Sequence, residues 1–370
     1  MKDLGKSLSQ KRKSLGLTLV EAARLSGIGS YQTIYKIEHE KRAIKADELA
    51  ALAKAYAFDL NFFLSGKELV EQCQIYWRAE EKPKRARVFE SRARLLLERY
   101  IRLQELIEHA AAGTKLPIIA RQVVSFDDAA DEGEKYANML RLGGRPALVF
   151  KRILEEDGNI PIFFLDLPTG TSALSLIMGN YSAICVNRKD TSWRRNFDIA
   201  HELFHVVYRQ VPPENCGASD NGIQESFANA FASAFLLPRS SLEKEIEKRT
   251  TNSKLNVLDL IMIACEYEIS LDALVWRLVN LGRISRATAE KILNFKEIKE
   301  HYKGLQKIKG ERLPYISKKY LCMIFDAFTQ GKMSEMSVAE YLDVPVGDTT
   351  RIFAEAGLVW EGKSAIEITV

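Results

Sequence analysis

The chain has 370 residues, 46% hydrophobic and 28% charged, which is typical of a folded globular protein and excludes a disordered or fibrous one. A chain of this length exceeds one comfortable hydrophobic core, so we expect two or three domains. The net charge of +4 is uneven: residues 1–102 hold 21 Lys and Arg against 13 Asp and Glu, and the remainder holds 32 against 36. Unless those basic residues only cover solvated helix faces, a polyanion is expected to bind the first part.

Targeting and membrane signals are not found in the sequence. The first residues, MKDLGKSLSQKRKSLG, contain no apolar stretch typical of a signal peptide. The sequence contains no run of about 18 uncharged apolar residues, so it predicts no membrane span. The five cysteines are scattered without a CxxC pair, as in proteins whose thiols stay reduced. We therefore expect a cytoplasmic protein with no membrane partner.

Residues 4–65 are expected to form five short helices. Thr18 is a suitable N-cap for the second helix, and Glu21 completes a capping box. Gly27 and Gly29 break the chain before Ser30, which caps the third helix. The other three helices are predicted at residues 4–15, 47–57 and 60–64.

A long Arg- and Leu-rich helical pattern over residues 84–112 predicts a connecting helix. This helix has three possible roles: a solvated spacer, a DNA contact or a dimerisation element. A homodimer is therefore one expected assembly. Residues 126–157 are also expected to be helical, with a second run starting at Arg145.

After residue 157 the spacing of apolar residues changes from a helical to a strand pattern. Strands are predicted at residues 160–165 and 182–187, separated by turns that contain Gly, Thr and Ser. One helix is expected from near Arg194, and a second, strongly apolar helix over residues 225–237. Helices dominate the rest, with breaks near Gly282, Gly304 and Gly310.

The segment FDIAHELFHVVY contains His201, Glu202 and His205 in an HExxH arrangement. Residues four positions apart on a helix share one face, so both imidazoles can bind one Zn²⁺ through ring nitrogens. Glu202 lies beside them, close to a metal-bound water but outside the ligand set. Zinc lowers the pKa of such a water, and the carboxylate can take its proton as the water attacks a carbonyl. The pattern therefore predicts a Zn²⁺ site with Glu202 as the catalytic residue.

A catalytic zinc site needs a third protein ligand and leaves its fourth place to water. The next part of the chain contains no further histidine, so we expect an acidic ligand. The near candidates are Glu214, Asp220 and Glu225. Glu225 opens an apolar helix that should pack beside the HExxH helix, whereas the other two lie in loops, so we favour Glu225 as the metal ligand.

Two other interpretations stay open. His201 and His205 could be ordinary helix residues, or a bound zinc could serve only to hold the fold. Glu202 favours catalysis, because a structural site has no need for it. Structural zinc sites usually have four protein ligands, often cysteine, and no cysteine here is spaced to complete one.

The segments RRNFDIAHELFH and ESFANAFASAFLLP together resemble the ImmA/IrrE family of metallopeptidases, over roughly residues 115–300. The resemblance implies that His201 and His205 are metal ligands and that Glu202 is the catalytic base. It also implies that Glu225 is the third ligand.

One position departs from this family, because Phe204 stands where its HELGH motif usually has glycine. Phe204 is expected to crowd the helix against a neighbour and to narrow the cleft. Residues 312–357 are similar to a helical tail often found in the family, in which Leu342 and Val344 would be core positions.

Residues 4–65 resemble the XRE-type helix-turn-helix of phage repressors, in the segments TLVEAA and IYKIE. Such a module lays the second helix of its motif in the major groove of DNA. Leu19 departs from the family, which usually has a phosphate-binding Gln there, and Glu38 is expected to turn inward. The alternative is a degenerate module used for dimerisation or partner docking. The expected DNA-binding residues are Ser30, Tyr31, Gln32, Thr33 and Lys36 on the recognition helix, and Lys41, Arg42 and Lys45 at the phosphates.

The expected fold class is α+β and mostly helical. We divide the chain into a five-helix, helix-turn-helix domain (1–66), a linker helix (67–115), a zincin-like peptidase domain with a small β-sheet (116–300) and a C-terminal helical module (301–370).

The expected function is that of a DNA-associated, zinc-dependent endopeptidase and transcription regulator. Its protein substrate would be one specific intracellular protein, a repressor or antitoxin-type regulator, with a strand near Ala183–Val186 pairing with the substrate backbone. The alternative is a non-catalytic, zinc-containing transcriptional regulator or antitoxin that acts through its helix-turn-helix.

Overall fold

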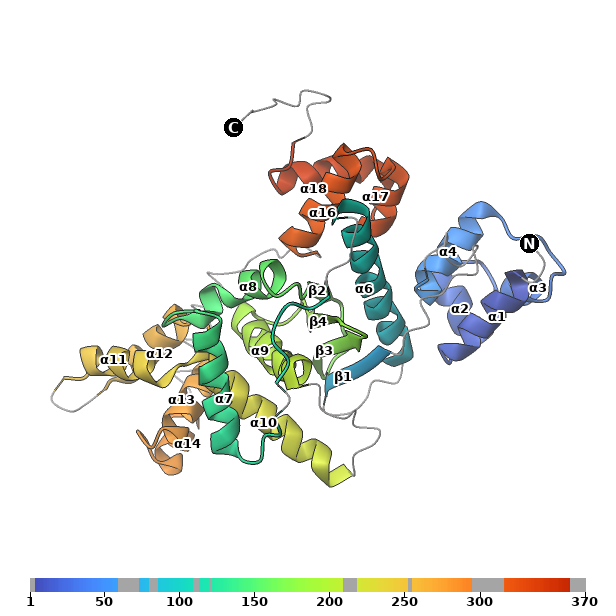
Figure 1. Cartoon of the computed structure of the whole chain (residues 1–370). Helices are drawn as coiled ribbons and strands as arrows, with labels where there is room; N and C mark the ends of the chain where they lie inside the picture. The colour runs from blue at the N-terminus through green and yellow to red at the C-terminus, as the bar shows by residue number, and fades with distance from the viewer. Residues whose placement is uncertain are drawn as a thin grey trace, which may run out of the picture.

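The computed structural model shows an N-terminal helical domain, a small sheet covered by helices, and further helices toward the C-terminus (Figure 1). It describes residues 4–58, 73–79, 86–108, 113–119, 121–208, 218–251, 255–294 and 316–359.

The N-terminal domain is helical, as expected. Its described helices are α1 (Leu4–Ser14), α2 (Leu19–Ser26), α3 (Tyr31–Glu38) and α4 (Ala46–Tyr56). They enclose their own hydrophobic core, in which Leu8, Ile34 and Leu52 are fully buried. The predicted fifth helix at residues 60–64 lies outside the described residues.

The turn between α2 and α3 forms as the sequence predicts. Thr18 and Glu21 make the reciprocal hydrogen bonds of a capping box. Gly27 then adopts a φ of 70°, a left-handed conformation that glycine tolerates best. Ser30 accepts a hydrogen bond from the backbone N–H of Thr33 and so caps α3.

A buried ion pair joins α1 to α3. Arg12 donates through Nε to Glu38 Oε1 at 2.6 Å and through Nη2 to Oε2 at 2.8 Å. Glu38 is buried, so its expected inward, structural role is confirmed. This bidentate pair fixes the recognition helix to the rest of the domain.

The sheet has four strands in the order β1-β3-β4-β2. The predicted strands form β2 (Ile162–Leu165) and β4 (Tyr181–Asn187), which run parallel. Two strands were not predicted: β3 (Thr171–Met178), which is antiparallel to β4, and β1 (Cys73–Ala79), which is antiparallel to β3. The expected linker segment therefore contributes an edge strand to the sheet.

One face of the sheet shares a hydrophobic core with the helices of the predicted peptidase domain. These are α7 (Phe126–Met139), α8 (Phe150–Glu156), α9 (Ser192–Tyr208) and α10 (Ala218–Leu236). Gly133 of α7 lies against the backbone of α10, where a Cβ would not fit. α7 and α10 therefore pack very closely.

The opposite face of the sheet packs on α6 (Ala86–Glu108) and α16 (Lys318–Thr329), and Figure 1 shows α6 alongside the strands. The predicted long helix is thus present. Its interpretation as a solvated spacer is wrong, because Ala93, Leu97 and Leu103 are fully buried in this core.

Short helices complete the described part of the chain. Gly282, with a φ of 69°, separates α13 (Leu271–Asn280) from α14 (Arg286–Asn294) as predicted, whereas Gly304 and Gly310 lie outside the described residues. In the C-terminal module, Leu342 is buried and Val344 packs against the same core. The other short helices are α11 (Arg239–Arg249) and α12 (Val257–Glu266) before Gly282, and α17 (Glu335–Leu342) and α18 (Thr349–Glu355) in the C-terminal module.

The fold is α+β and mostly helical, as the sequence predicts. None of the helices in the described ranges combines the length and apolar character that a membrane span needs.

Candidate metal centre

Helix α9 presents His201, Glu202 and His205 toward the space between the sheet and α10. The helix is buried along most of its length because it lies between these two layers. His201 and His205 are one turn apart, and their ring centroids are 5.2 Å from each other. The local spacing thus produces the pair of imidazoles that the sequence predicts.

Glu225 of α10 meets both histidines. Its Oε2 lies 3.0 Å from His201 Nε2 and its Oε1 lies 3.3 Å from His205 Nε2, while the two Nε2 atoms are 3.4 Å apart. Each residue offers a ligand atom, and these atoms all lie within 4.8 Å of one another. The three residues together form the candidate metal cluster.

The expectation that Glu225 opens its helix is wrong. α10 begins at Ala218, so Glu225 lies inside the helix, where the regular backbone fixes its direction. Glu214 and the side chain of Asp220 lie outside the described part of the structure. Among the described acidic residues, Glu225 is the one that joins the histidines.

The donor set fits a metal ion. Two imidazole nitrogens and one carboxylate oxygen are usual zinc donors, and they leave one position open. Burial lowers the pKa of His201 to about 3, so this ring is neutral, as a ligand must be. Burial would raise the pKa of Glu225, but the hydrogen bonds from His201 and His205 outweigh it and hold the carboxylate ionised.

Glu202 lies beside the cluster without joining it. Ser175 of β3 donates its hydroxyl to Glu202 Oε2 at 2.6 Å, whereas Oε1 is buried with no hydrogen-bond partner among the described residues. Burial raises the pKa of Glu202 to about 7. The carboxylate is therefore oriented through one oxygen, and the other remains available to a ligand.

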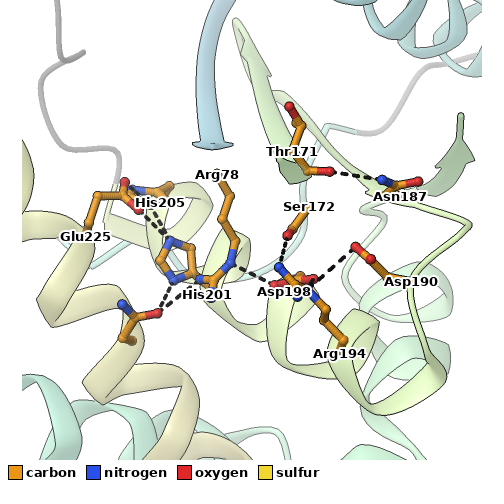
Figure 2. A network of polar contacts seen from close by, with 11 residues as sticks. Arg78, Thr171, Ser172, Asn187, Asp190, Arg194, Asp198, His201, His205 and Glu225 are labelled. Carbon is orange, nitrogen blue, oxygen red and sulfur yellow. Dashed lines mark hydrogen bonds and ion pairs between the residues drawn. The ribbon is translucent and has the colours of Figure 1, made fainter. Parts of the chain in front are cut away.

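Strand β1 supplies two site residues that the sequence reasoning missed. The ring of Tyr76 stacks on His205, with centroids 5.3 Å apart and planes 10° apart. Two residues on, Arg78 reaches α9 and α10 (Figure 2). The period-2 spacing of Tyr76 and Arg78 within CQIYWRA was the available signal, because alternate strand residues share one face.

Asn229 was missed as well. It follows Glu225 by one helical turn, and its Oδ1 lies 3.0 Å from His201 Nδ1. The same oxygen accepts a hydrogen bond from Arg78 at 3.1 Å. A polar residue one turn beyond a ligand on the same helix was the signal that could have found it.

Two aromatic residues of α9 are buried in the interior of the domain. Phe204 is fully buried, with ring contacts to Tyr208 and Phe231, so it fills the interior between α9 and α10. Tyr208 is also buried and donates to Glu132 at 3.3 Å. Tyr208 is held against α7.

The recognition helix α3 exposes part of the predicted DNA-binding set. Tyr31, Gln32 and Lys36 are exposed, and so is Tyr35, which the prediction omitted. Lys41 Nζ lies 5.4 Å from the centroid of the Tyr35 ring. These side chains form one exposed aromatic and basic surface.

Other members of that set have partners within the domain. The Ser30 and Thr33 hydroxyls lie 3.2 Å apart at the cap of α3. Arg42 donates to Glu48 at 2.8 Å, and Lys45 is exposed. Leu19 packs partly buried against the domain core.

Comparison with known proteins yields two family matches. Residues 155–279 match a peptidase family described as the IrrE N-terminal-like domain, and residues 8–63 match a helix-turn-helix family. The first match includes the whole candidate cluster, whereas Tyr76 and Arg78 lie outside it. No curated protein matches the sequence.

Among solved structures, a Mycobacterium tuberculosis transcriptional regulator is similar at 16% identity, over 50% of this chain and 51% of its own. The similarity thus spans about half of that protein, and its TM-score of 0.30 is too low to support a shared fold or function. The two family matches carry the comparison: residues 8–63 are similar to helix-turn-helix domains of the XRE type, and residues 155–279 are similar to the IrrE N-terminal-like peptidase domain.

Proposed function

We propose that this protein is a DNA-bound regulator whose peptidase domain is a zinc-dependent endopeptidase. Its substrate is one specific intracellular protein, a repressor or antitoxin-type regulator. The observation that carries the proposal is the convergence of His201, His205 and Glu225 within 4.8 Å, with Glu202 outside the ligand set. A structural zinc site has no need for such a free, oriented carboxylate.

Each residue of the site has a role in this proposal. His201, His205 and Glu225 hold the zinc, and Glu202 is the general base. The bound ion would polarise the scissile carbonyl and lower the pKa of a water molecule. Glu202 takes a proton from the water molecule that attacks the carbonyl and returns it to the leaving amine. Its raised pKa suits both transfers.

The substrate is proposed to bind in extended form along the sheet. The expected pairing at Ala183–Val186 is wrong, because β4 is hydrogen-bonded to β3 on one side and β2 on the other. The edge strand beside the cluster is β1, whose Tyr76 contacts His205. An extended peptide that pairs with the sheet near the cluster would therefore meet β1.

DNA is proposed to bind α3 and the residues after it. Tyr31, Gln32 and Lys36 would meet base edges, while Lys41 and Arg42 would meet phosphates. In a fluorescence titration against duplex DNA, Lys41→Ala should reduce the slope of log K against log salt by about one. An unchanged slope and affinity would indicate that the domain docks another partner.

A substrate trap tests the peptidase. The Glu202→Gln protein would be expressed in its native host and recovered, and proteins bound to it identified by mass spectrometry. Each candidate would then be incubated with the unaltered protein and zinc, with and without a chelator. Cleavage that chelation stops would support the proposal and name the substrate.

The controls separate catalysis from folding. Glu202→Gln should retain zinc and lose about 10²–10⁴-fold in cleavage rate, because a general base contributes that much. Glu243→Gln alters an acid on α11 outside the cluster and should leave cleavage unchanged. If a partner binds the unaltered and Glu202→Gln proteins equally and is never cut, the protein is a non-catalytic regulator whose zinc holds the fold.

A further inference from the structure

Arg78 connects the two helices that carry the candidate ligands. Its Nε lies 2.7 Å from Asp198 Oδ1 on α9, and its Nη1 donates to Asn229 Oδ1 on α10 at 3.1 Å. Its guanidinium also lies 5.3 Å from the ring centroid of Phe197. Asp198 is buried three residues before His201, so the arginine is anchored close to the cluster (Figure 2).

The contact with Arg78 determines which way the Asn229 amide points. A guanidinium carries only donors, so the Asn229 atom that faces it must be the carbonyl oxygen and not the NH₂ group. That oxygen is also 3.0 Å from His201 Nδ1. Since it can only accept, Nδ1 must donate to it once a metal ion takes the lone pair of Nε2, and the ring proton of the metal-bound form therefore lies on Nδ1.

The position of this proton decides how His201 can act. A neutral imidazole carries one N–H, so a proton on Nδ1 leaves the lone pair on Nε2. Nε2 is the nitrogen that faces Glu225 at 3.0 Å. Hydrogen bonds of this kind fix the tautomer and orientation of histidine ligands at metal sites.

We propose that Arg78 is a positioning residue of the metal site, which acts through Asn229 to keep the His201 proton on Nδ1. The inference rests on the proposed function, because it assumes that His201 binds metal through Nε2. Without Arg78, the Asn229 amide is free to turn by 180° and offer its NH₂ group to Nδ1, which favours the opposite tautomer. The residue comes from β1, outside the matched peptidase domain.

The test compares the full-length protein with Arg78→Gln by two measurements. Zinc affinity is measured by competition with a chromophoric chelator. The protonation of His201 Nδ1 in zinc-saturated protein is read from its ¹⁵N imidazole shifts, assigned through His201→Gln. We expect Arg78→Gln to bind zinc about 10–100-fold more weakly and to lose its preference for Nδ1–H. Zinc affinity within twofold of the unaltered protein, together with a retained Nδ1 proton, would overturn the proposal.

Arg188→Gln is the matched control. Arg188, which follows β4, makes an ion pair of the same length with Asp166, at 2.7 Å, and its side chain is exposed to a similar extent as that of Arg78. Its loss should leave zinc affinity and the tautomer unchanged. An effect as large as that of Arg78→Gln would show that any lost arginine pair disturbs the domain, and would also overturn the proposal.

Substitutions at Asn229 decide the question if Arg78→Gln fails to fold. Asn229→Asp keeps an oxygen acceptor for both donors and should keep the Nδ1 proton and zinc binding, whereas Asn229→Ala should lose them. Equal zinc affinity and an equal tautomer in these two variants would contradict the proposal. If the unaltered protein binds zinc but cuts no protein, the proposed function fails and the zinc affinities of these variants still decide the role of Arg78. If it binds no zinc, both proposals fail.

Discussion

At the residue scale, Phe204 shows how the core between α9 and α10 accommodates one departure from a family motif. Its ring fills the space between α9 and α10, against Tyr208 and Phe231, where the resembled motif usually has glycine. The side chain therefore stabilises the helix that carries the histidines.

Replacing Phe204 with the glycine of the family motif should destabilise this protein. The substitution leaves a cavity in a closed core and places glycine inside a helix, at a combined cost of roughly 4–6 kcal/mol. The free energy of unfolding, measured in urea for both proteins, checks this. A loss below about 1 kcal/mol would mean that the neighbouring rings close the gap.

The three HExxH residues were predictable because local geometry brings them together. His201, Glu202 and His205 lie within one helical turn, so their spacing already contains the arrangement. The period-2 spacing of Tyr76 and Arg78 indicates a shared strand face, but it does not place Arg78 or Ser175 at the site, because strand pairing across long stretches of chain brings them there. No pattern around either residue encodes that pairing.

At the element scale, β3 shows why two strands were missed. All eight of its residues are buried, since helices cover the sheet on both faces. Such a strand shows no alternation of polar and apolar residues, and TSALSLIM therefore resembles a turn with flanking apolar residues. β2 and β4 were recognised from their β-branched and aromatic residues.

The junction of α8, β2 and the C-terminal module contains a carboxyl group with a raised pKa. Glu155 accepts a hydrogen bond from the backbone N–H of Ile162 at 3.2 Å. Burial raises its pKa to about 7, against the opposing effect of hydrogen bonds from Ser317 and Ile162. The folded protein therefore binds this proton more tightly than the unfolded chain, whose pKa is near 4.5.

This group should make stability depend on pH. Its contribution is fully present below pH 4.5 and is lost as the pH rises through about 7. Between pH 5 and pH 8, the unaltered protein should lose about 2–3 kcal/mol more unfolding free energy than Glu155→Gln. Denaturant titrations of both proteins at the two pH values measure the difference. Parallel pH profiles would show that Glu155 titrates near its ordinary value when folded.

At the scale of the whole molecule, the candidate metal site can be followed separately from the N-terminal domain. All four tryptophans follow the N-terminal domain in the sequence, so tryptophan fluorescence reports on the rest of the chain. Bound zinc should stabilise that part, because the ligands converge only in the folded state.

Chelation should therefore lower the melting temperature recorded by tryptophan fluorescence. Zinc at 100 times its dissociation constant contributes about 2.7 kcal/mol, and chelation removes that amount. His201→Gln, which lacks one ligand, should melt at the same temperature with or without the chelator. A chelator effect of equal size in both proteins would place the metal elsewhere.

Strand β1 is the element through which DNA binding would reach the metal site. It is the first described element after α4, it pairs with β3 on one side, and it carries Tyr76 and Arg78 to the candidate ligands. Any displacement of β1 by DNA binding would therefore change the affinity for zinc. Because linkage is reciprocal, zinc would change the affinity for DNA by the same factor, so a peptidase substrate need not be known to detect communication between the two domains.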